Sequence, residues 1–301
     1  MRIFVTGGSG FVGQHVLKEL DKQDVEILLL LMSPEKTILK PEKSEIIYGD
    51  LNNLNNIQRE IVDFNPQVCM HFAWQGIPDY SETLSKINLN NSIKLCDLLV
   101  NETNCKKIII SGSCFEYGRT KGACKENQKT KCNSFFSWAK QSLCNYLTLL
   151  CKHKNVNIFW GRIFYVYGPM QRKGSLIPAI VDSFMRGQAP QINKPLNAND
   201  FVYVEDIAEA FCMAAKANIP SGVYNIGSGV STEVIRFCKI IEKELFGSTN
   251  MTNKIINTTN SRQELNFWAD TSKSKKYLRW FAQTNIQQGI RRYLKGAGLI
   301  N

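Results

Sequence analysis

Short apolar runs alternate with longer segments in which apolar residues recur at helical spacing along the first half of the chain. Runs rich in Ile, Val and Leu predict buried strands, and the amphipathic segments between them predict helices. Strands are expected at residues 3–5, 25–31, 45–48, 68–72, 107–110 and 157–164, and helices at residues 11–22, 56–64 and 84–100. Because runs such as "EILLLL" are apolar on both faces, we predict an α/β fold with a doubly wound parallel sheet covered by helices.

The pattern loosens after residue 166, where Gly, Pro and Asn reach the density typical of loops. Two later segments, "DFVYVEDIAEAF" and "GVYNIGSG", look like further core strands, so the second region is expected to interleave with the first. We therefore expect a larger domain over residues 1–166 and about 201–226, and a smaller C-terminal α/β domain over residues 167–200 and 227–301.

The charge of the chain favours an anionic partner. Its 301 residues carry a net charge of +11, from 37 Lys and Arg residues against 26 Asp and Glu residues. The lysines are spread along the chain, and the densest clusters, at residues 273–276 and 291–292, lack the interleaved aromatic residues of a base-stacking groove. We therefore expect no nucleic-acid partner, and an anionic small molecule accounts for the charge.

Cysteine and histidine spacing argues against a metal site. The ten cysteines and three histidines show no CxxC, HExxH or CxxH pattern, and free thiols in such number indicate a reducing compartment. The first residues lack the regions of a signal peptide, and the longest apolar run, residues 27–32, is far shorter than the roughly 20 residues of a membrane span. We expect a cytoplasmic protein without a metal or a membrane partner.

A glycine-rich turn joins the first expected strand to the first expected helix. It reads TGGSGFVG over residues 6–13, with glycines at 7, 10 and 13. Glycines at such a turn let the backbone approach a pyrophosphate, whose charge then lies at the helix N-terminus, and the last glycine lets the helix pack on the strand. The position of this turn favours dinucleotide binding over an ordinary strand-to-helix connection.

The GxxGxxG spacing resembles that of the extended short-chain dehydrogenase/reductase family, which includes NAD-dependent epimerases and dehydratases, and the resemblance spans nearly the whole chain. It implies a Rossmann domain that holds the dinucleotide and a smaller C-terminal domain that binds the substrate. By this resemblance the cofactor contacts are Gly7, Ser9, Gly10, Phe11, Val12, Gly13, Asp50, Leu51, Phe72, Ala73, Lys140 and Phe164.

The end of the second expected strand bears on the choice of cofactor. An acidic side chain there would bond the ribose hydroxyls and select NAD. This chain has Met32-Ser33-Pro34 instead, and Ser33 with Lys36 or Lys40 fits a 2′-phosphate. We therefore favour NADP as the cofactor, with NAD as the alternative.

The resemblance also implies a catalytic set of a Ser or Thr and a Tyr-x-x-x-Lys pair, in which the tyrosine exchanges a proton with the substrate oxygen. "SGSCFEYG" supplies Ser113 and "NSFFSWAKQSL" supplies Lys140, but the tyrosine position is Phe136, which has no proton to give. Another group supplies the proton, or the protein binds without efficient turnover, or the residue is a Tyr-to-Phe variant. For the first explanation the sequence offers Cys114, Glu116, Tyr165 and a water ordered by Lys140.

Three segments are similar to bacterial reductases that act at C4 of CDP- or dTDP-4-keto-6-deoxyhexoses, namely "HFAWQGIPDY", "SCFEYG" and "GRIFYVYGPMQRKGSL". Dehydratases of the family carry a carboxylate directly after the Ser or Thr, where this chain has Cys114-Phe115, so dehydration is disfavoured. Asn199 stands where a basic diphosphate contact is usual. The similarity implies substrate contacts at Trp74, Gln75, Ser113, Cys114, Tyr165, Lys173, Ser175 and Arg262.

The sequence thus predicts NAD(P)H-dependent reduction of the C4 ketone of a CDP-, dTDP- or GDP-linked 4-keto-6-deoxy sugar, as in the synthesis of bacterial surface polysaccharides. A nucleotide-sugar 4-epimerase would use the same residues. A non-catalytic protein that binds the dinucleotide and the nucleotide sugar fits the loss at position 136. Because helices such as those expected at 81–100 and 135–150 commonly pair between subunits in this family, the resemblance implies a homodimer.

Overall fold

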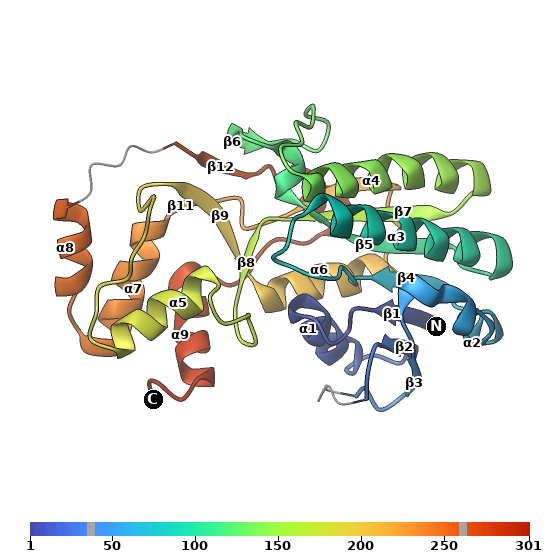
Figure 1. Ribbon diagram of the computed structural model, residues 1–301, viewed down its shortest axis with the longest axis horizontal. Helices are drawn as coiled ribbons and strands as arrows, with labels where there is room; N and C mark the ends of the chain where they lie inside the picture. The colour runs from blue at the N-terminus through green and yellow to red at the C-terminus, as the bar shows by residue number, and fades with distance from the viewer. Residues whose placement is uncertain (35–39, 259–263) are drawn as a thin grey trace.

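The computed structural model describes residues 1–34, 40–258 and 264–301 (Figure 1). Within these residues the larger sheet has seven strands, all parallel, in the order β10-β7-β5-β4-β1-β2-β3. The order reverses between β1 and β4, which is where ligands bind in doubly wound sheets. The predicted fold class is confirmed. The strands are β1 (Arg2–Thr6), β2 (Glu26–Leu31), β3 (Ser44–Tyr48), β4 (Val68–His71), β5 (Lys107–Ser113), β7 (Asn157–Ile163) and β10 (Gly222–Ile226).

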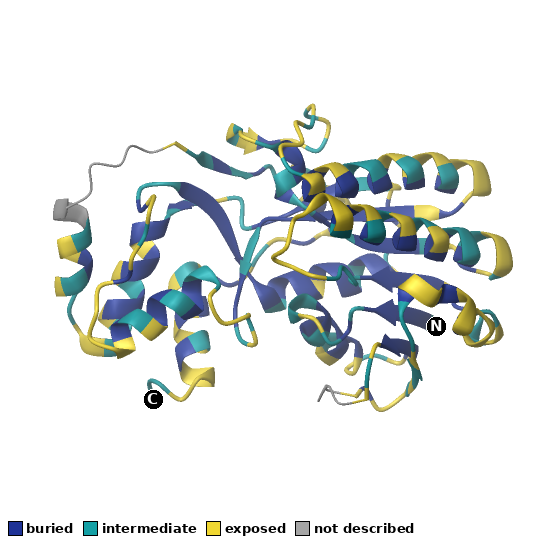
Figure 2. Cartoon of the chain, viewed as in Figure 1, coloured by how far each residue is buried: buried dark blue, intermediate teal, exposed yellow. Residues whose placement is uncertain are grey.

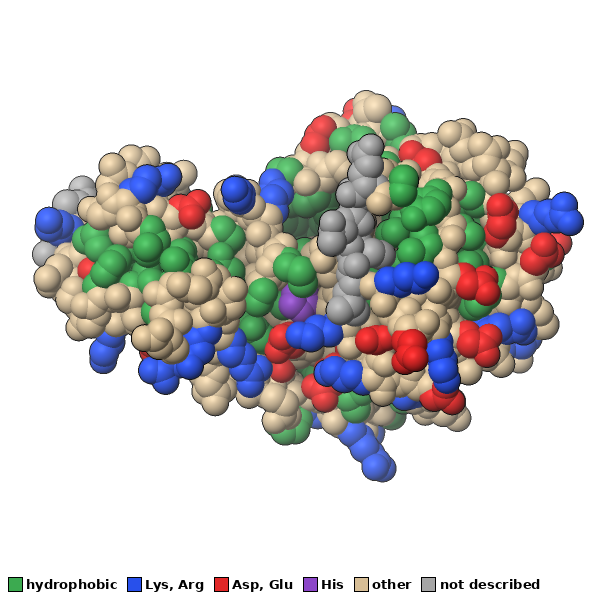
Figure 3. All heavy atoms as spheres, turned by 90° about the horizontal axis from the view of Figure 1, so that it is seen from below, with side chains coloured by type: hydrophobic (Ala, Val, Ile, Leu, Met, Phe, Trp, Pro, Cys, Tyr) green, Lys and Arg blue, Asp and Glu red, His purple; other side chains and the backbone are tan. Residues whose placement is uncertain are grey.

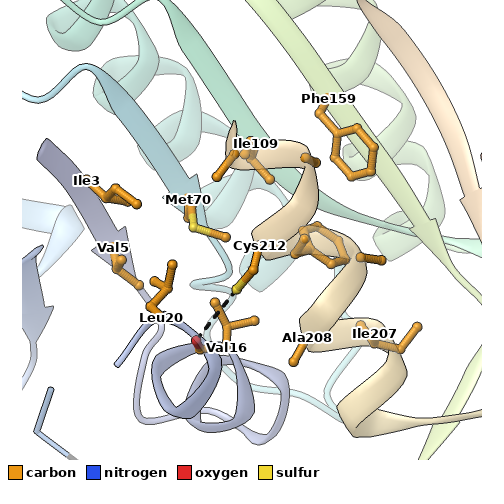
Figure 4. Close-up of a cluster of buried hydrophobic side chains, with 14 of the residues drawn as sticks. Ile3, Val5, Val16, Leu20, Met70, Ile109, Phe159, Ile207, Ala208 and Cys212 are labelled. Carbon is orange, nitrogen blue, oxygen red and sulfur yellow. Dashed lines mark hydrogen bonds between the residues drawn. The ribbon is translucent and has the colours of Figure 1, made fainter. Parts of the chain in front are cut away.

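Helices cover both faces of this sheet because its strands are apolar on both sides. On one face α1 (Phe11–Leu20) packs beside α6 (Val204–Lys216), and Figure 4 shows Val16 beside Cys212, whose thiol donates to the Val16 carbonyl oxygen. On the other face lie α2 (Gln58–Phe64), α3 (Glu82–Glu102) and α4 (Phe135–Lys154). Figure 2 shows the strands between these layers as the most deeply buried part of the chain.

A second, smaller sheet lies beside the first, in the order β11-β9-β12-β6, with β8 paired to β9. Helices α5, α7 and α9 enclose an apolar core around β9, while α8 packs on α7. The elements are β6 (Lys121–Cys124), β8 (Tyr165–Tyr167), α5 (Leu176–Met185), β9 (Ala198–Tyr203), β11 (Ser231–Glu233), α7 (Val234–Phe246), α8 (Asn250–Thr258), β12 (Asn266–Ala269) and α9 (Ile286–Gly296).

One expected strand belongs to the other sheet. Both late apolar segments form strands, and β10 does join the larger sheet, but β9 pairs with β8, β11 and β12 in the smaller one. All six positions of β9 are buried, so its apolar pattern is that of a core strand, and the pattern does not reveal its neighbours. Residues 201–203 therefore lie outside the larger sheet, while α6 directly after them packs against it.

Several element ends also differ from the pattern. The strand expected at 107–110 continues to Ser113 as β5, because Ser111, Gly112 and Ser113 keep pairing with β7. The helix expected from residue 56 is preceded by a 3-10 segment, η1 (Leu51–Asn56), and begins at Gln58. Over the described residues, no helix combines the length and the apolar character that crossing a bilayer requires.

Candidate active site

A cavity of about 810 Å³ opens at the carboxyl ends of β1, β2, β4 and β5. The smaller sheet closes it with residues of β8 and of the loop before α5, so both sheets contribute to its walls. The predicted site residues that line it are Gly7, Ser9, Gly10, Phe11, Val12, Gly13, Leu51, Phe72, Ala73, Trp74, Gln75, Ser113, Cys114, Phe136, Lys140, Phe164, Tyr165 and Ser175.

The glycine-rich turn forms the β1 end of this cavity. Gly7 has a φ of +73°, and a Cβ there would lie 2.4 Å from the Ala73 amide nitrogen; a Cβ on Gly13 would lie 2.1 Å from the Gly7 carbonyl oxygen. The turn is closed by the Gly10 amide, which donates to the Gly7 carbonyl at 2.9 Å. The N-cap of α1 receives no side-chain hydrogen bond from the described residues, so its first amides stay available for an anion. These features fit the pyrophosphate of a dinucleotide.

Asp50 follows β3 and does not itself line the cavity, although Gly49 and Leu51 on either side of it do. Its carboxylate accepts hydrogen bonds from the Asn52 amide at 2.9 Å and from Gln75 Nε2 at 2.9 Å. Burial alone would raise the pKa of Asp50, but these hydrogen bonds outweigh it and the pKa is lowered. Asp50 is therefore an anionic acceptor at neutral pH.

The Gln75 side chain lines the cavity and bonds to Asp50. Its backbone is held by Asn88, whose side chain accepts from the Gln75 amide at 2.7 Å and donates to the Gln75 carbonyl at 3.1 Å. Asn88, Asn91 and Ser92 of α3 line the cavity, and sequence analysis missed them. The missed signal was a set of polar residues at helical spacing in an otherwise packed helix.

The predicted basic contacts lie in three segments of the chain. At the end of β2, Met32 lines the cavity, whereas Lys36 and Arg262 lie outside the described residues. Lys173 is exposed and does not line the cavity, while the neighbouring Arg172 does. Of the two adjacent basic residues, Arg172 is thus the one placed to meet a ligand in the cavity.

Ser113 and Lys140 meet in the same cavity from different elements. Ser113 caps the 3-10 segment η2 (Cys114–Tyr117), and its Oγ accepts from the Phe115 amide at 3.2 Å, which leaves the hydroxyl proton free to donate. Lys140 lies one turn into α4, and its Nζ donates to the Ser111 carbonyl at 2.8 Å. Burial lowers the pKa of Lys140 to about 7, although the charge of Glu116 opposes the shift.

Glu116 forms a buried ion pair with Arg162 beneath Ser113. It is fully buried, accepts from Arg162 Nε at 2.7 Å and from Trp160 Nε1 at 3.0 Å, and its Oε1 accepts the Ser113 amide at 2.8 Å. It does not line the cavity, so it is not the proton source that the sequence left open. The thiol of Cys114 does line the cavity, and burial raises its pKa far above the usual range, which keeps it neutral.

Phe136 lies in a cluster of aromatic rings at the far end of the cavity. Its ring centroid lies 4.9 Å from that of Tyr80, 5.7 Å from Trp74 and 6.2 Å from Phe115. Lys140 Nζ lies 3.9 Å from the Trp74 centroid and 6.0 Å from that of Phe136. Sequence analysis missed Tyr80, since no spacing rule connects the loop after β4 with the start of α4.

The outer surface on the face drawn in Figure 3 carries charges of both signs. On the face drawn in Figure 3, Lys and Arg side chains are spread along the molecule and interspersed with Asp and Glu. Among the described residues, no group of three or more His, Cys, Asp or Glu side chains is arranged to hold a metal ion. The cavity is thus the feature of the described chain that brings the predicted site residues together.

Comparison with known proteins agrees with this architecture. Residues 3–227 match the model of the NAD-dependent epimerase/dehydratase family. A protein described as a putative UDP-glucose 4-epimerase of Methanocaldococcus jannaschii is 25% identical, with 96% of each chain covered. The dTDP-4-dehydro-6-deoxyglucose reductase of Escherichia coli is 26% identical, with 81% of each chain covered. The solved UDP-glucose 4-epimerase of Thermotoga maritima has the same fold, with a TM-score of 0.83, 21% identity and 98% of each chain covered.

Proposed function

The chain belongs to the NAD-dependent epimerase/dehydratase family, and from this premise we propose that it reduces the C4 ketone of a nucleotide-linked 4-keto-6-deoxy sugar with a nicotinamide dinucleotide. One observation carries the proposal. The glycine turn, Ser113 and Lys140 line a single cavity, at the place where doubly wound sheets bind ligands. The similarity to the Escherichia coli reductase, whose name states a 4-dehydro-6-deoxy sugar substrate, supports the same reaction.

The dinucleotide would lie along the carboxyl ends of the strands, with its pyrophosphate on the turn of residues 7–13, its adenosine near Asp50 and its nicotinamide ribose near Lys140. When bound, the nicotinamide supplies the hydride for the sugar carbon. We propose NADP as the preferred form, because the end of β2 offers Met32 and Ser33 in place of a carboxylate. NAD is the alternative.

The sugar nucleotide would occupy the other end of the cavity. The Ser113 hydroxyl, which keeps its proton while Oγ accepts from the Phe115 amide, donates to the C4 oxygen. Trp74, Tyr165 and Cys114 form the wall around the sugar, and Arg172 and Ser175 lie where the diphosphate would approach. Dehydration is disfavoured, because Cys114 and Phe115 carry no carboxylate and the Glu116 carboxylate is paired with Arg162.

A 4-epimerase is the second candidate. The Methanocaldococcus jannaschii relative carries that description, and epimerisation would use the same cavity residues. The two functions differ in what happens to the dinucleotide, because an epimerase retains its cofactor through the cycle whereas a reductase consumes it.

We also propose a homodimer formed through α3 and α4. These helices pack side by side on one face of the larger sheet, and they carry exposed apolar side chains such as Leu149, which is 62% exposed. Sedimentation velocity of the chain at micromolar concentration is expected to give twice the mass of one chain, and a single-chain mass would contradict this interface.

The function is tested by following the oxidation of NADPH and NADH with CDP-, dTDP- and GDP-4-keto-6-deoxy sugars. We expect stoichiometric oxidation with one nucleotide series and faster turnover with NADPH. Interconversion of 4-hydroxy epimers without net cofactor consumption would favour the epimerase. Tight nucleotide-sugar binding, with neither reaction in this chain nor in Phe136→Tyr, would indicate a binding protein.

A further inference from the structure

Tyr80, in the loop after β4, packs its phenol ring against the ring of Phe136. Tyr80 lines the cavity, and its ring centroid lies 4.9 Å from that of Phe136 at an interplanar angle of 48°. The same ring lies edge-on to Phe115, with centroids 6.3 Å apart and an interplanar angle of 81°. Because Phe115 and Phe136 are themselves 6.2 Å apart, the three rings form one cluster, in which Tyr80 contacts both the residue at the usual acid position and the segment that begins with Ser113.

We propose that the Tyr80 hydroxyl donates the proton to the C4 oxygen, in place of the phenol that is missing at position 136. This assignment rests on the proposed reduction. Tyr80 would then be the general acid, a role that we assign to neither the glycine turn, Ser113 nor Lys140.

The other candidate groups are less suited to proton transfer. Glu116 is committed to Arg162, and the buried Cys114 thiol is neutral with a strongly raised pKa. Tyr165 packs into the aromatic core of the smaller sheet, where its ring centroid lies 5.6 Å from Phe201, and burial raises its pKa well above the usual value. Tyr80 keeps 39% of its surface exposed, so its proton can be replaced from water.

One cation that faces Tyr80 opposes the effect of its burial. Burial raises the pKa of its phenol, and the guanidinium of Arg172, from the loop before α5, opposes that rise. Across the cavity, the charge of an ionised Tyr80 adds to the burial that raises the pKa of Tyr165, so the two hydroxyls lie in one electrostatic neighbourhood. Lys140 of α4 lies beyond Phe136, with its Nζ 6.0 Å from the centroid of that ring. The Tyr80 hydroxyl forms no hydrogen bond with the described residues, which leaves its proton for a ligand.

The step balances with the reductant of the proposed function. The reduced nicotinamide gives a hydride to C4, the π electron pair of the C4 carbonyl moves to oxygen, and that oxygen takes the proton of Tyr80. The resulting phenolate regains a proton from water through its exposed side. The ketone is reduced to an alcohol and the dinucleotide is oxidised.

Four variants test the assignment by kinetics. Tyr80→Phe is expected to lower kcat by about 10²–10⁴-fold, which is the usual contribution of a positioned acid, with the KM for the nucleotide sugar within about threefold. Phe136→Tyr in the Tyr80→Phe background is expected to recover at least about tenfold of that loss. Tyr277→Phe is the matched control, because Tyr277 is 40% exposed and lies outside the cavity. A loss of kcat in Tyr165→Phe, with Tyr80→Phe unaffected, overturns the proposal.

A second measurement does not depend on turnover. Tyrosinate absorbance is titrated in the intact chain and in Tyr80→Phe, with and without a saturating 4-keto-6-deoxy nucleotide sugar and without dinucleotide. The difference between the two proteins reports the Tyr80 phenol, and its pKa is expected to rise when the sugar binds, because a carbonyl oxygen accepts a hydrogen bond only from the neutral form. An unchanged pKa at saturation, with binding established by calorimetry, overturns the proposal.

The two proposals fail in different ways. Turnover by Phe136→Tyr but not by the unmodified chain removes Tyr80 as the acid and leaves the reductase function standing. Turnover by none of the proteins with any of the three nucleotide series overturns both.

Discussion

The two ends of the cavity differ in what builds them. The cofactor end is made of backbone, in which Gly7 and Gly13 leave no room for a Cβ and the N-terminus of α1 faces the space that they open. The sugar end is made of side chains, with Trp74, Tyr80 and Phe136 packed ring against ring from separate segments. A binding site that is formed by backbone atoms tolerates few substitutions. In a site that is formed by side chains, one functional group can be lost and a neighbouring side chain can take over its role. This difference explains how the dinucleotide features stay intact while the usual acid is absent.

The largest expected effect comes from the buried ion pair between Glu116 and Arg162, which lies beneath Ser113 at the sugar end. Glu116→Gln leaves the cation of Arg162 buried without its partner, which should cost about 3–5 kcal/mol of unfolding free energy. Urea denaturation measures the loss. The control is Glu82→Gln, which breaks an ion pair between side chains of Glu82 and Lys86 that are 50% and 60% exposed. It should change stability by less than about 1 kcal/mol. Equal losses in the two variants would contradict a supporting role for the buried pair.

The next largest effect is expected from a substitution that disrupts only the cofactor end. A Cβ at Gly13 would lie 2.1 Å from the Gly7 carbonyl oxygen, so Gly13→Ala must displace backbone. We expect the displaced turn to bind the dinucleotide about 100-fold more weakly in fluorescence titration, which is a loss of about 3 kcal/mol of binding free energy. Gly296→Ala is the control, because Gly296 also lies in a helix and a Cβ there meets nothing within 4 Å. Unaltered binding in Gly13→Ala would show that the turn does not hold the dinucleotide.

Lys140 gives a pH-dependent test of the sugar end. Burial lowers its pKa to about 7, so between pH 7 and the ordinary lysine value the unfolded chain binds a proton that the folded chain does not. The cost of burying Lys140 is therefore complete at pH 7 and below, and it fades as the pH rises toward that value. Lys140→Met should stabilise the chain by about 3 kcal/mol at pH 7, after the loss of the hydrogen bond to the Ser111 carbonyl, and by less than about 1 kcal/mol at pH 10.

Thermal unfolding at the two pH values measures this difference. Lys86→Met is the control, because the Lys86 side chain is 60% exposed and its substitution should give the same small change at both values. A gain in Lys140→Met that does not depend on pH would contradict a depressed pKa for Lys140.

The smallest expected effect is that of a substitution at Gln75, which tests whether this side chain belongs to the cofactor end or to the sugar end. Gln75→Ala removes one hydrogen bond to Asp50, so the pKa of Asp50 should rise and dinucleotide affinity should fall about fivefold. Calorimetry with the dinucleotide and with the nucleotide sugar separates the two ligands, and nucleotide-sugar binding should change less. If the nucleotide sugar loses more affinity than the dinucleotide, Gln75 serves the sugar pocket as the sequence first suggested.

The fold and the cofactor end were largely predictable from sequence. Alternating apolar runs predict a parallel sheet, and a glycine turn at its first strand needs only local spacing to be recognised. The assignment of β9 failed, because a strand buried at all six positions has the same pattern in either sheet.

Much of the sugar end could not be read from the sequence. Gln75 is drawn to Asp50 by contacts with Asn88 and Asn52, which no local pattern encodes. The sequence revealed the missing phenol at Phe136, but the nearness of Tyr80 depends on how the loop after β4 folds over the start of α4. A site whose side chains come from several segments can be recognised only from the tertiary structure. A site that the backbone of one segment forms can be recognised from the sequence.

The central claim is that both ends of the cavity act on one sugar carbon. It is tested most directly by incubating the unmodified chain with dinucleotide carrying deuterium at the transferable position of nicotinamide C4, together with a 4-keto-6-deoxy nucleotide sugar. The account predicts one deuterium at C4 of the product sugar, detected by mass spectrometry and NMR. Product without deuterium at C4, or oxidation of the dinucleotide that leaves the sugar unchanged, would contradict it.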